Sequence, residues 1–254
     1  MASFMIVGTN SCCGKSFTSS ALIRFLRSKG YSVAPFKAQN ISSQAVEIGN
    51  GKEIAVSTFI QSSMAEIEPD SVMNPVLIKP DKGNMKIYLN GIFYASDNYR
   101  EYSRYIPAIK DTVLTCFHRL KGQYDFIIIE GAGSPAEINC LEEDISNSFM
   151  ASMADSAIVV GDISLGGFFA AMHGTLELMP QNLRSKVCAF IVNKYLGEKN
   201  KLLCGISAIE RWHDIKCIGI IPYMSQPRDL AELKDLLDAV VSTEYDFKFL
   251  FATH

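Results

Sequence analysis

The residues from Gly8 to Ser16, GTNSCCGKS, have the types and spacing to bind a phosphate chain. They follow the apolar run Phe4–Val7 and precede a segment with apolar residues on one helical face. A glycine-bounded loop between a strand and a helix wraps backbone N–H groups around phosphate oxygens. We expect Lys15 to contact the outer phosphates and the Ser16 hydroxyl to ligate magnesium. The common P-loop has four residues between its first glycine and its Gly-Lys pair. Here five residues lie between Gly8 and Gly14.

Two further charged residues could act on the same phosphates. Glu130 ends the apolar run that begins at Phe126, and small residues follow it. A carboxylate in this place resembles a magnesium-associated acid, and a helix cap or a turn acid is the alternative. Lys37 directly follows the apolar run Ser32–Phe36. A second cation there could meet the γ-phosphate or a substrate carboxylate, or it could be an ordinary solvated lysine.

Glu53 and Asn193 are weaker candidates. Glu53 is predicted to open a helical segment, where it could be a second acid near the metal or an acid favoured by the helix dipole. Asn193 and Lys194 follow the apolar run that ends at Val192. An amide there could read the edge of a nucleobase, or it could close a turn.

The cysteines and histidines predict neither a disulfide framework nor a metal site. The seven cysteines show no CxxC spacing, so we expect reduced thiols. Cys12 and Cys13 lie in the predicted phosphate loop, where they are small tolerated residues or oxidation-sensitive thiols. The four histidines lack metal-ligand spacing. We interpret His118 and His173, which lie in helical stretches, as structural.

Short apolar runs alternate with amphipathic stretches almost to the end of the chain. The predicted strands are 3–7, 32–36, 126–130, 157–161, 187–192 and 217–221. One predicted helix covers 17–29, and three more begin near 107, 202 and 230. Continuous apolar runs are typical of strands buried on both faces of a parallel sheet. Asn90-Gly91 between two short apolar runs predicts a hairpin. We therefore expect one α/β domain over residues 1–254, a three-layer P-loop fold with a mostly parallel twisted sheet and helices on both faces.

Composition excludes several classes of protein. Of the 254 residues, 48% are hydrophobic and 20% charged, which is ordinary for a globular chain. The net charge of -3 leaves no basic stripe for nucleic acid. The apolar runs are too short to span a bilayer, and the N-terminus lacks a signal-peptide pattern. We expect a cytoplasmic protein.

Seven segments together resemble a known family. They are GTNSCCGKS at Gly8, APFKAQNIS at Ala34, MNPVLIKP at Met73, EGAGSPAEIN at Glu130, the GG-F-FA pattern from Gly166, VNK at Val192 and IGIIPY at Ile218. In this order they resemble the N-terminal synthetase domain of the cobyric acid synthase family, which is related to dethiobiotin synthetase. The resemblance covers about residues 4–223.

The resemblance implies an ATP- and Mg²⁺-dependent amide ligase that activates a corrinoid carboxylate as an acyl phosphate for attack by ammonia. Its implied nucleotide-binding residues are Thr9, Asn10, Ser11, Cys12, Cys13, Gly14, Lys15, Ser16, Phe17, Asn193, Lys194 and Pro222. Its implied substrate-side residues are Lys37, Gln39, Asn40, Asn74, Lys79, Gly131, Ala132, Gly133, Ser134, Glu137 and Asn139. Its implied metal ligands are Ser16, Glu53 and Glu130, and Lys15, Lys37 and Glu130 carry the catalysis. A homodimer is also implied.

The chain departs from the family pattern at four sites. The family has an acid at Cys12, Asp-Arg at Ser164 and Leu165, Arg at Leu196, and Gly-Arg-x-Gln at 55–58. The missing arginines would have been partners for anionic groups. Family members continue into a glutaminase domain, so we expect ammonia to come free or from a separate glutaminase subunit. A dethiobiotin synthetase-like carboxylase and a non-catalytic nucleotide-binding protein stay as alternatives.

The last apolar residues of the chain have two interpretations. They form either a docking strand for a partner or a last core strand. The residues concerned are Phe247, Phe249, Leu250 and Phe251.

Overall fold

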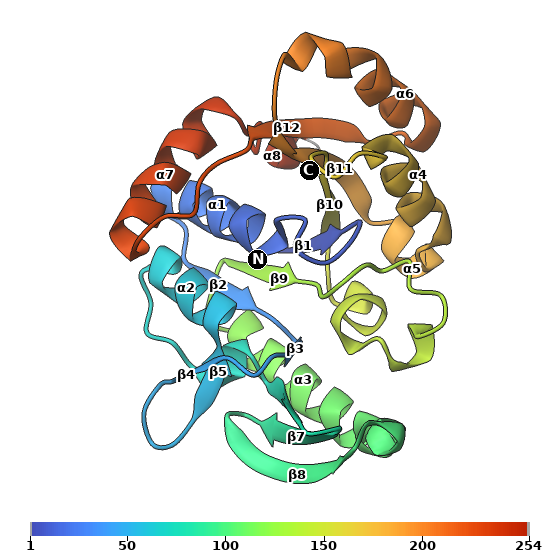
Figure 1. Ribbon diagram of the computed structural model, residues 1–254. Coiled ribbons are helices and arrows are strands. Elements are labelled where there is room, and N and C mark those ends of the chain that lie inside the picture. The colour runs from blue at the N-terminus through green and yellow to red at the C-terminus, as the bar shows by residue number, and fades with distance from the viewer. Residues whose placement is uncertain (1, 253–254) are drawn as a thin grey trace.

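A central sheet of six parallel strands organises the protein, whose computed structural model describes residues 2–252 (Figure 1). The strand order is β12-β11-β10-β1-β9-β2. The bounds are β1 (Ala2–Gly8), β2 (Val33–Phe36), β9 (Phe126–Glu130), β10 (Ser156–Asp162), β11 (Val187–Tyr195) and β12 (Lys216–Pro222). All six strands predicted from the apolar runs are confirmed. Since they are parallel, their carboxyl ends share one edge of the sheet.

Helices cover both faces of this sheet. They are α1 (Lys15–Ser28), α2 (Val56–Ala65), α3 (Ile106–Lys121), α4 (Phe168–Leu178), α5 (Gln181–Arg184), α6 (Leu203–His213), α7 (Leu230–Thr243) and α8 (Phe249–Ala252). Alternate residues of β1 point to opposite faces. Phe4 and Ile6 pack into the core that contains α1, α2 and α7, whereas Met5 and Val7 pack into the core that contains α3, α4 and α6. The predicted three-layer α/β fold is confirmed (Figure 1).

A second, smaller sheet follows β2 in the chain. Its order is β3-β6-β7-β8, and β4 pairs with β5 beside it. The bounds are β3 (Gln39–Ile41), β4 (Ala45–Glu47), β5 (Glu53–Ala55), β6 (Val76–Asp81), β7 (Asn84–Leu89) and β8 (Ile92–Asn98). Asn90 and Gly91, with φ of 51° and 77°, form the turn between β7 and β8. The predicted hairpin is confirmed by the antiparallel pairing of β7 with β8, and a turn with two positive φ angles matches the twist of the strands it joins.

Two local predictions inside the chain are wrong. Glu53 begins the short strand β5 instead of a helix, because its backbone pairs with Glu47 across the β4–β5 ladder. Asn193 and Lys194 lie within β11, which continues to Tyr195 opposite Pro222.

The C-terminal residues turn into the helix α8 instead of a strand. Phe247 and Leu250 are buried in the core around α1 and α7, so the core interpretation of this segment is the correct one. Within residues 2–252, none of the helices combines the length and apolar character that a bilayer span requires.

Candidate functional site

The loop between β1 and α1 has the backbone shape of an anion site. The Thr9 amide anchors it to β10 through the Val160 carbonyl at 3.0 Å. Gly14 has a φ of 109°, and a Cβ there would lie 1.9 Å from the Asn193 amide nitrogen, so this position requires glycine. Among residues 2–252, no side chain caps the first turn of α1. Its free N–H groups and the helix dipole therefore favour an anion at this end.

Lys15 points across the mouth of this loop. Its side chain is buried, and its ammonium donates to the Asn10 carbonyl at 2.9 Å and to the Gly133 carbonyl at 2.8 Å. The loop also holds Thr9, Asn10, Ser11, Cys12 and Cys13, and Ser16 and Phe17 follow Lys15 on α1. A fixed cation thus lies between the β1–α1 loop and the loop after β9.

Glu130 accepts hydrogen bonds from Lys37, another predicted catalytic residue, and from Ser16, a predicted metal ligand. Glu130 is buried at the carboxyl end of β9. One oxygen accepts from the Ser16 hydroxyl at 2.9 Å and from the Lys37 ammonium at 2.7 Å. The other accepts from the Gln61 amide at 2.5 Å. Gln61 was not predicted from the sequence, although it shares a polar face of the buried helix α2 with Thr58, three residues before it.

The same residues suit a magnesium-bound nucleotide. A hydroxyl and a carboxylate are the hard oxygen donors that magnesium prefers. Beside them on α2, the buried Oγ1 of Thr58 and Oε1 of Gln61 have no hydrogen-bond partner among the described residues. Buried polar atoms without partners are costly, so these atoms fit a ligand or water that completes the site.

Asn193 and Lys194 of β11 donate hydrogen bonds to backbone carbonyls of the β1–α1 loop. The Asn193 amide donates to the Cys13 carbonyl at 2.8 Å, and the Lys194 ammonium donates to the Cys12 carbonyl at 2.8 Å. Lys194 also pairs with Asp162 at 2.6 Å. Burial raises the pKa of Asp162, but hydrogen bonds from Lys194 and Ser164 outweigh it, and the net pKa is lowered.

Pro222, the remaining predicted nucleotide contact, is half-buried at the end of β12. It lies opposite Tyr195 in the register of β11 and β12.

Glu53 and Asn74 are held by other partners. Glu53 forms an ion pair with Lys79 at 2.6 Å, and within residues 2–252 no hydrogen bond or ion pair joins it to Ser16 or Glu130. Asn74 is fully buried, donates to the Lys37 carbonyl at 2.8 Å and accepts from the Ala55 amide at 2.9 Å. Asn74 therefore positions the backbone of Lys37.

A cavity of about 380 Å³ lies beside this site. Of the predicted substrate-side residues it is lined by Gln39, Ala132, Gly133, Ser134 and Glu137. The other six predicted residues do not line it: Lys37, Asn40, Asn74, Lys79, Gly131 and Asn139.

Tyr102, which the sequence analysis did not find, also lines the cavity and donates to the Gln39 side chain at 2.5 Å. Burial raises the pKa of Tyr102 to about 12 against the opposing hydrogen bond to Gln39. Its hydroxyl is thus a neutral donor at physiological pH.

Three comparisons with known proteins bear on this site. Residues 4–236 match the family model described as the CobQ/CobB/MinD/ParA nucleotide binding domain. The solved structure of apo McdA from Cyanthece superposes with a TM-score of 0.50 at 12% identity, covering 96% of this chain and 94% of that one. At this identity the likeness concerns the fold alone.

Two sequence relatives are much closer. A probable cobyric acid synthase from Archaeoglobus fulgidus is 41% identical over 228 residues, which are 88% of this chain and 49% of the relative. A probable cobyric acid synthase from Methanococcus voltae is also 41% identical over 228 residues, which are 88% of this chain and 99% of that sequence. The chain spans about half the length of most such relatives.

Proposed function

The chain belongs to the CobQ/CobB/MinD/ParA nucleotide-binding domain family and to the cobyric acid synthase family within it, and from this premise we propose a ligase function. The proposed reaction consumes ATP with Mg²⁺, converts a corrinoid carboxylate into an acyl phosphate and forms an amide when ammonia attacks it. The single observation that carries the proposal is the convergence of Ser16 and Lys37 on one oxygen of Glu130, beside the Lys15 loop. Supply of the ammonia by a separate glutaminase, a homodimeric state and a cytoplasmic location stay predictions.

The charges around Glu130 suit phosphoryl transfer, which depends mainly on position and on neutralised charge. Bound ATP would supply the phosphoryl group, and bound magnesium would neutralise its oxygens. The loop N–H groups and Lys15 would hold the phosphates, and Ser16 and Glu130 would hold the metal. Lys37 would then be free to orient the substrate carboxylate beside the phosphoryl group.

The cavity beside the site supports a substrate that presents neutral hydrogen-bonding groups. Glu137, Glu143, Asp144 and Tyr102 lie on its wall. Carboxylates repel an anionic group but accept hydrogen bonds from amide N–H groups. We therefore propose that the cavity receives a peripheral amide or apolar arm of the substrate, while Lys37 receives the reacting acid.

The test mixes the purified chain with ATP, Mg²⁺, ammonium chloride and a corrinoid acid with free peripheral carboxylates. We expect ADP and phosphate in equal amounts with an amidated corrinoid, detected by mass spectrometry. The variant Lys15→Ala should lose ADP release, because its cation meets the phosphates. The exposed Lys29→Ala at the end of α1 is the matched control and should retain it.

Three outcomes would contradict the proposal. One is ADP release that ignores the corrinoid acid. A second is release that depends on bicarbonate and a diamine acid without a response to ammonia, which is the dethiobiotin synthetase-like reaction. A third is nucleotide binding without hydrolysis under every substrate, which indicates a non-catalytic protein.

A further inference from the structure

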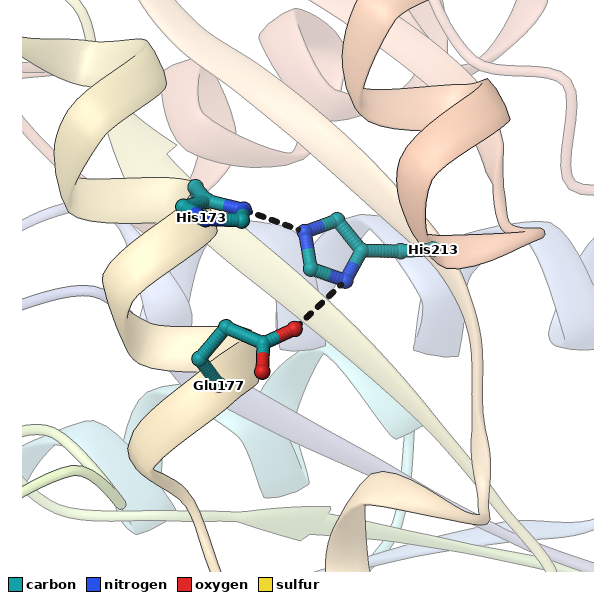
Figure 2. Close-up of side chains that lie close together, drawn as sticks. All are labelled: His173, Glu177 and His213. Atoms are coloured by element: carbon teal, nitrogen blue, oxygen red, sulfur yellow. Dashed lines mark hydrogen bonds and ion pairs between the residues drawn. The ribbon is translucent and has the colours of Figure 1, made fainter.

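Two histidines and a glutamate meet on the surface away from the nucleotide loop (Figure 2). His173 and Glu177 lie four residues apart on α4, so they share one face of the helix. His213 is the last residue of α6 and approaches them from the neighbouring helix. One ligand atom from each residue falls in a set whose members all lie within 4.8 Å of one another.

His213 has a buried ring nitrogen without a hydrogen-bond partner among the described residues, which suits a ligand. Its side chain is only 3% exposed, and the nitrogen concerned is Nδ1. Oε1 of Glu177 lies 3.7 Å from this nitrogen, which is too far for a hydrogen bond. Two ligands on one tetrahedral zinc ion lie about 3.3 Å apart, given bonds of about 2.0–2.1 Å. The gap is therefore close to the spacing that a shared metal ion sets.

The protonation state of the pair also suits a metal. Nδ1 of His173 and Nε2 of His213 are 2.8 Å apart, so one ring must present a lone pair to the other. Neutral imidazole is the form that ligates metals.

Among the described residues, Arg184 forms an ion pair with Glu177 and would compete with a metal ion for its carboxylate. Its guanidinium donates to both carboxylate oxygens, at 3.1 Å and 2.5 Å. Each carboxylate oxygen has a second lone pair, so the ion pair weakens metal binding without blocking it.

We propose that His173, Glu177 and His213 bind one divalent transition-metal ion, with zinc the best match, which links α4 to α6. Two imidazoles and a carboxylate form a ligand set that zinc uses when a fourth position stays open. The ion would bind Nδ1 of His213 and a carboxylate oxygen of Glu177, and His173 would exchange its hydrogen bond to Nε2 of His213 for a bond to the same ion. This site is separate from the nucleotide loop, because α6 ends at His213 just before the amino end of β12.

The single tryptophan of the chain reports on this site. Trp212 is 63% exposed, and its ring centroid is 5.4 Å from that of His173. Cobalt(II) takes the geometry of zinc, absorbs visible light and quenches a nearby indole. The full chain, freed of metal with a chelator, is titrated with cobalt and then with zinc as competitor. We expect saturable one-to-one quenching that zinc reverses, with visible absorption bands.

Four variants separate the site from accidental binding. His213→Ala and Glu177→Gln should each weaken cobalt binding by at least the roughly tenfold that even outer-shell changes cause. His213 is buried, so His213→Ala could unfold the chain. Glu177 is exposed, so Glu177→Gln should retain the fold and test the site in that case. Arg184→Ala should tighten binding several-fold because it frees the carboxylate. The exposed His118→Ala on α3 is the matched control and should bind as the parent does.

Three results would overturn the proposal. They are the absence of saturable quenching, quenching that Glu177→Gln leaves unchanged, and the near-ultraviolet charge-transfer absorption of cobalt bound to cysteine thiolates in place of imidazole.

Discussion

At the scale of single residues, the ion pair between Lys37 and Glu130 is the most consequential contact of the site. Their side chains are 11% and 2% exposed. Two charges removed from water cost free energy that only their mutual attraction and further hydrogen bonds recover. Ser16, Ser57 and Gln61 provide those further bonds. The pair is thus pre-arranged, so that the site contains a carboxylate for a metal and a cation for an acid.

We predict strong coupling between these two charges. Lys37→Met and Glu130→Gln should each lower the free energy of unfolding by about 3 kcal/mol, because each leaves a buried charge without its partner. The double variant should lose at least about 1 kcal/mol less than the sum of the two. Urea unfolding of the four proteins measures this. Additive losses would show that the two charges do not interact in the folded chain.

Asn193 allows two roles that one experiment separates. In the structure its amide donates to the Cys13 carbonyl and lies against Gly14, which makes it a brace of the loop. Asn193→Ala should therefore weaken binding of ATP and of inorganic triphosphate by similar factors, in the roughly fivefold to tenfold range of one lost hydrogen bond. Calorimetric titration of both ligands measures this. Weakened ATP binding with unchanged triphosphate binding would instead assign Asn193 to the base.

At the scale of elements, Glu66 joins three helices on one face of the sheet. It follows α2 and forms ion pairs with Arg24 and Arg27 of α1 and with Lys234 of α7. The hydrogen bond from Lys234, followed by that from Arg24, lowers the pKa of Glu66 from 4.5 to about 2. A carboxylate whose pKa is lower in the folded chain stabilises the fold above its unfolded pKa.

We predict that Glu66→Gln is destabilising near pH 7 and that the loss disappears in acid. The stabilisation falls as the pH drops from about 4.5 towards about 2, because the carboxylate becomes protonated. Glu66 is 45% exposed, so we expect only about 1 kcal/mol. Urea unfolding at pH 7 and in acid, with the exposed Glu101→Gln as control, measures it. An equal loss at both pH values would contradict the electrostatic explanation.

The regular elements could be predicted because their signals are local. The run Phe126–Glu130 is apolar at every position before its acid, and the strand has these bounds. Ile109, Val113, Phe117 and Leu120 repeat at helical spacing, and all four are buried on α3. Glu53 and the C-terminal residues could not be assigned, because tertiary partners decide their backbone. Glu53 pairs with Glu47, and Phe247 packs against Phe25 of α1.

At the scale of the whole molecule, the two proposed sites lie at opposite ends of the parallel strands. Parallel strands bring Glu130 of β9 and the loop after β1 to the carboxyl edge, which is why residues distant in sequence could be grouped from sequence alone. Helices return the chain to the other edge, where α6 ends at His213. The histidine cluster could not be found from the spacing of residues in the sequence. His173 and His213 lie 40 residues apart, and they meet because α4 packs against α6 (Figure 1).

This separation predicts that the two proposed sites are energetically independent. Changes at sites that share no partners usually add within about 0.5 kcal/mol, roughly a factor of two in affinity. Lys15→Ala should therefore abolish nucleotide binding and leave the cobalt affinity within about twofold of the parent's. His213→Ala should do the reverse. Calorimetry for the nucleotide and Trp212 fluorescence for cobalt measure the two affinities on the same protein samples.

A larger effect of one site on the affinity of the other would indicate that the nucleotide and the metal ion are coupled. Binding free energies are reciprocal, so a metal that changes nucleotide affinity must have its own affinity changed by the nucleotide to the same degree. Coupling between opposite edges would need an element that both ligands move. β11 and α6 are adjacent in the chain, and β11 contains Asn193 while α6 ends at His213. A tenfold effect of His213→Ala on nucleotide binding, with none from His118→Ala, would make α6 the transmitting element and the metal a regulator instead of a structural link.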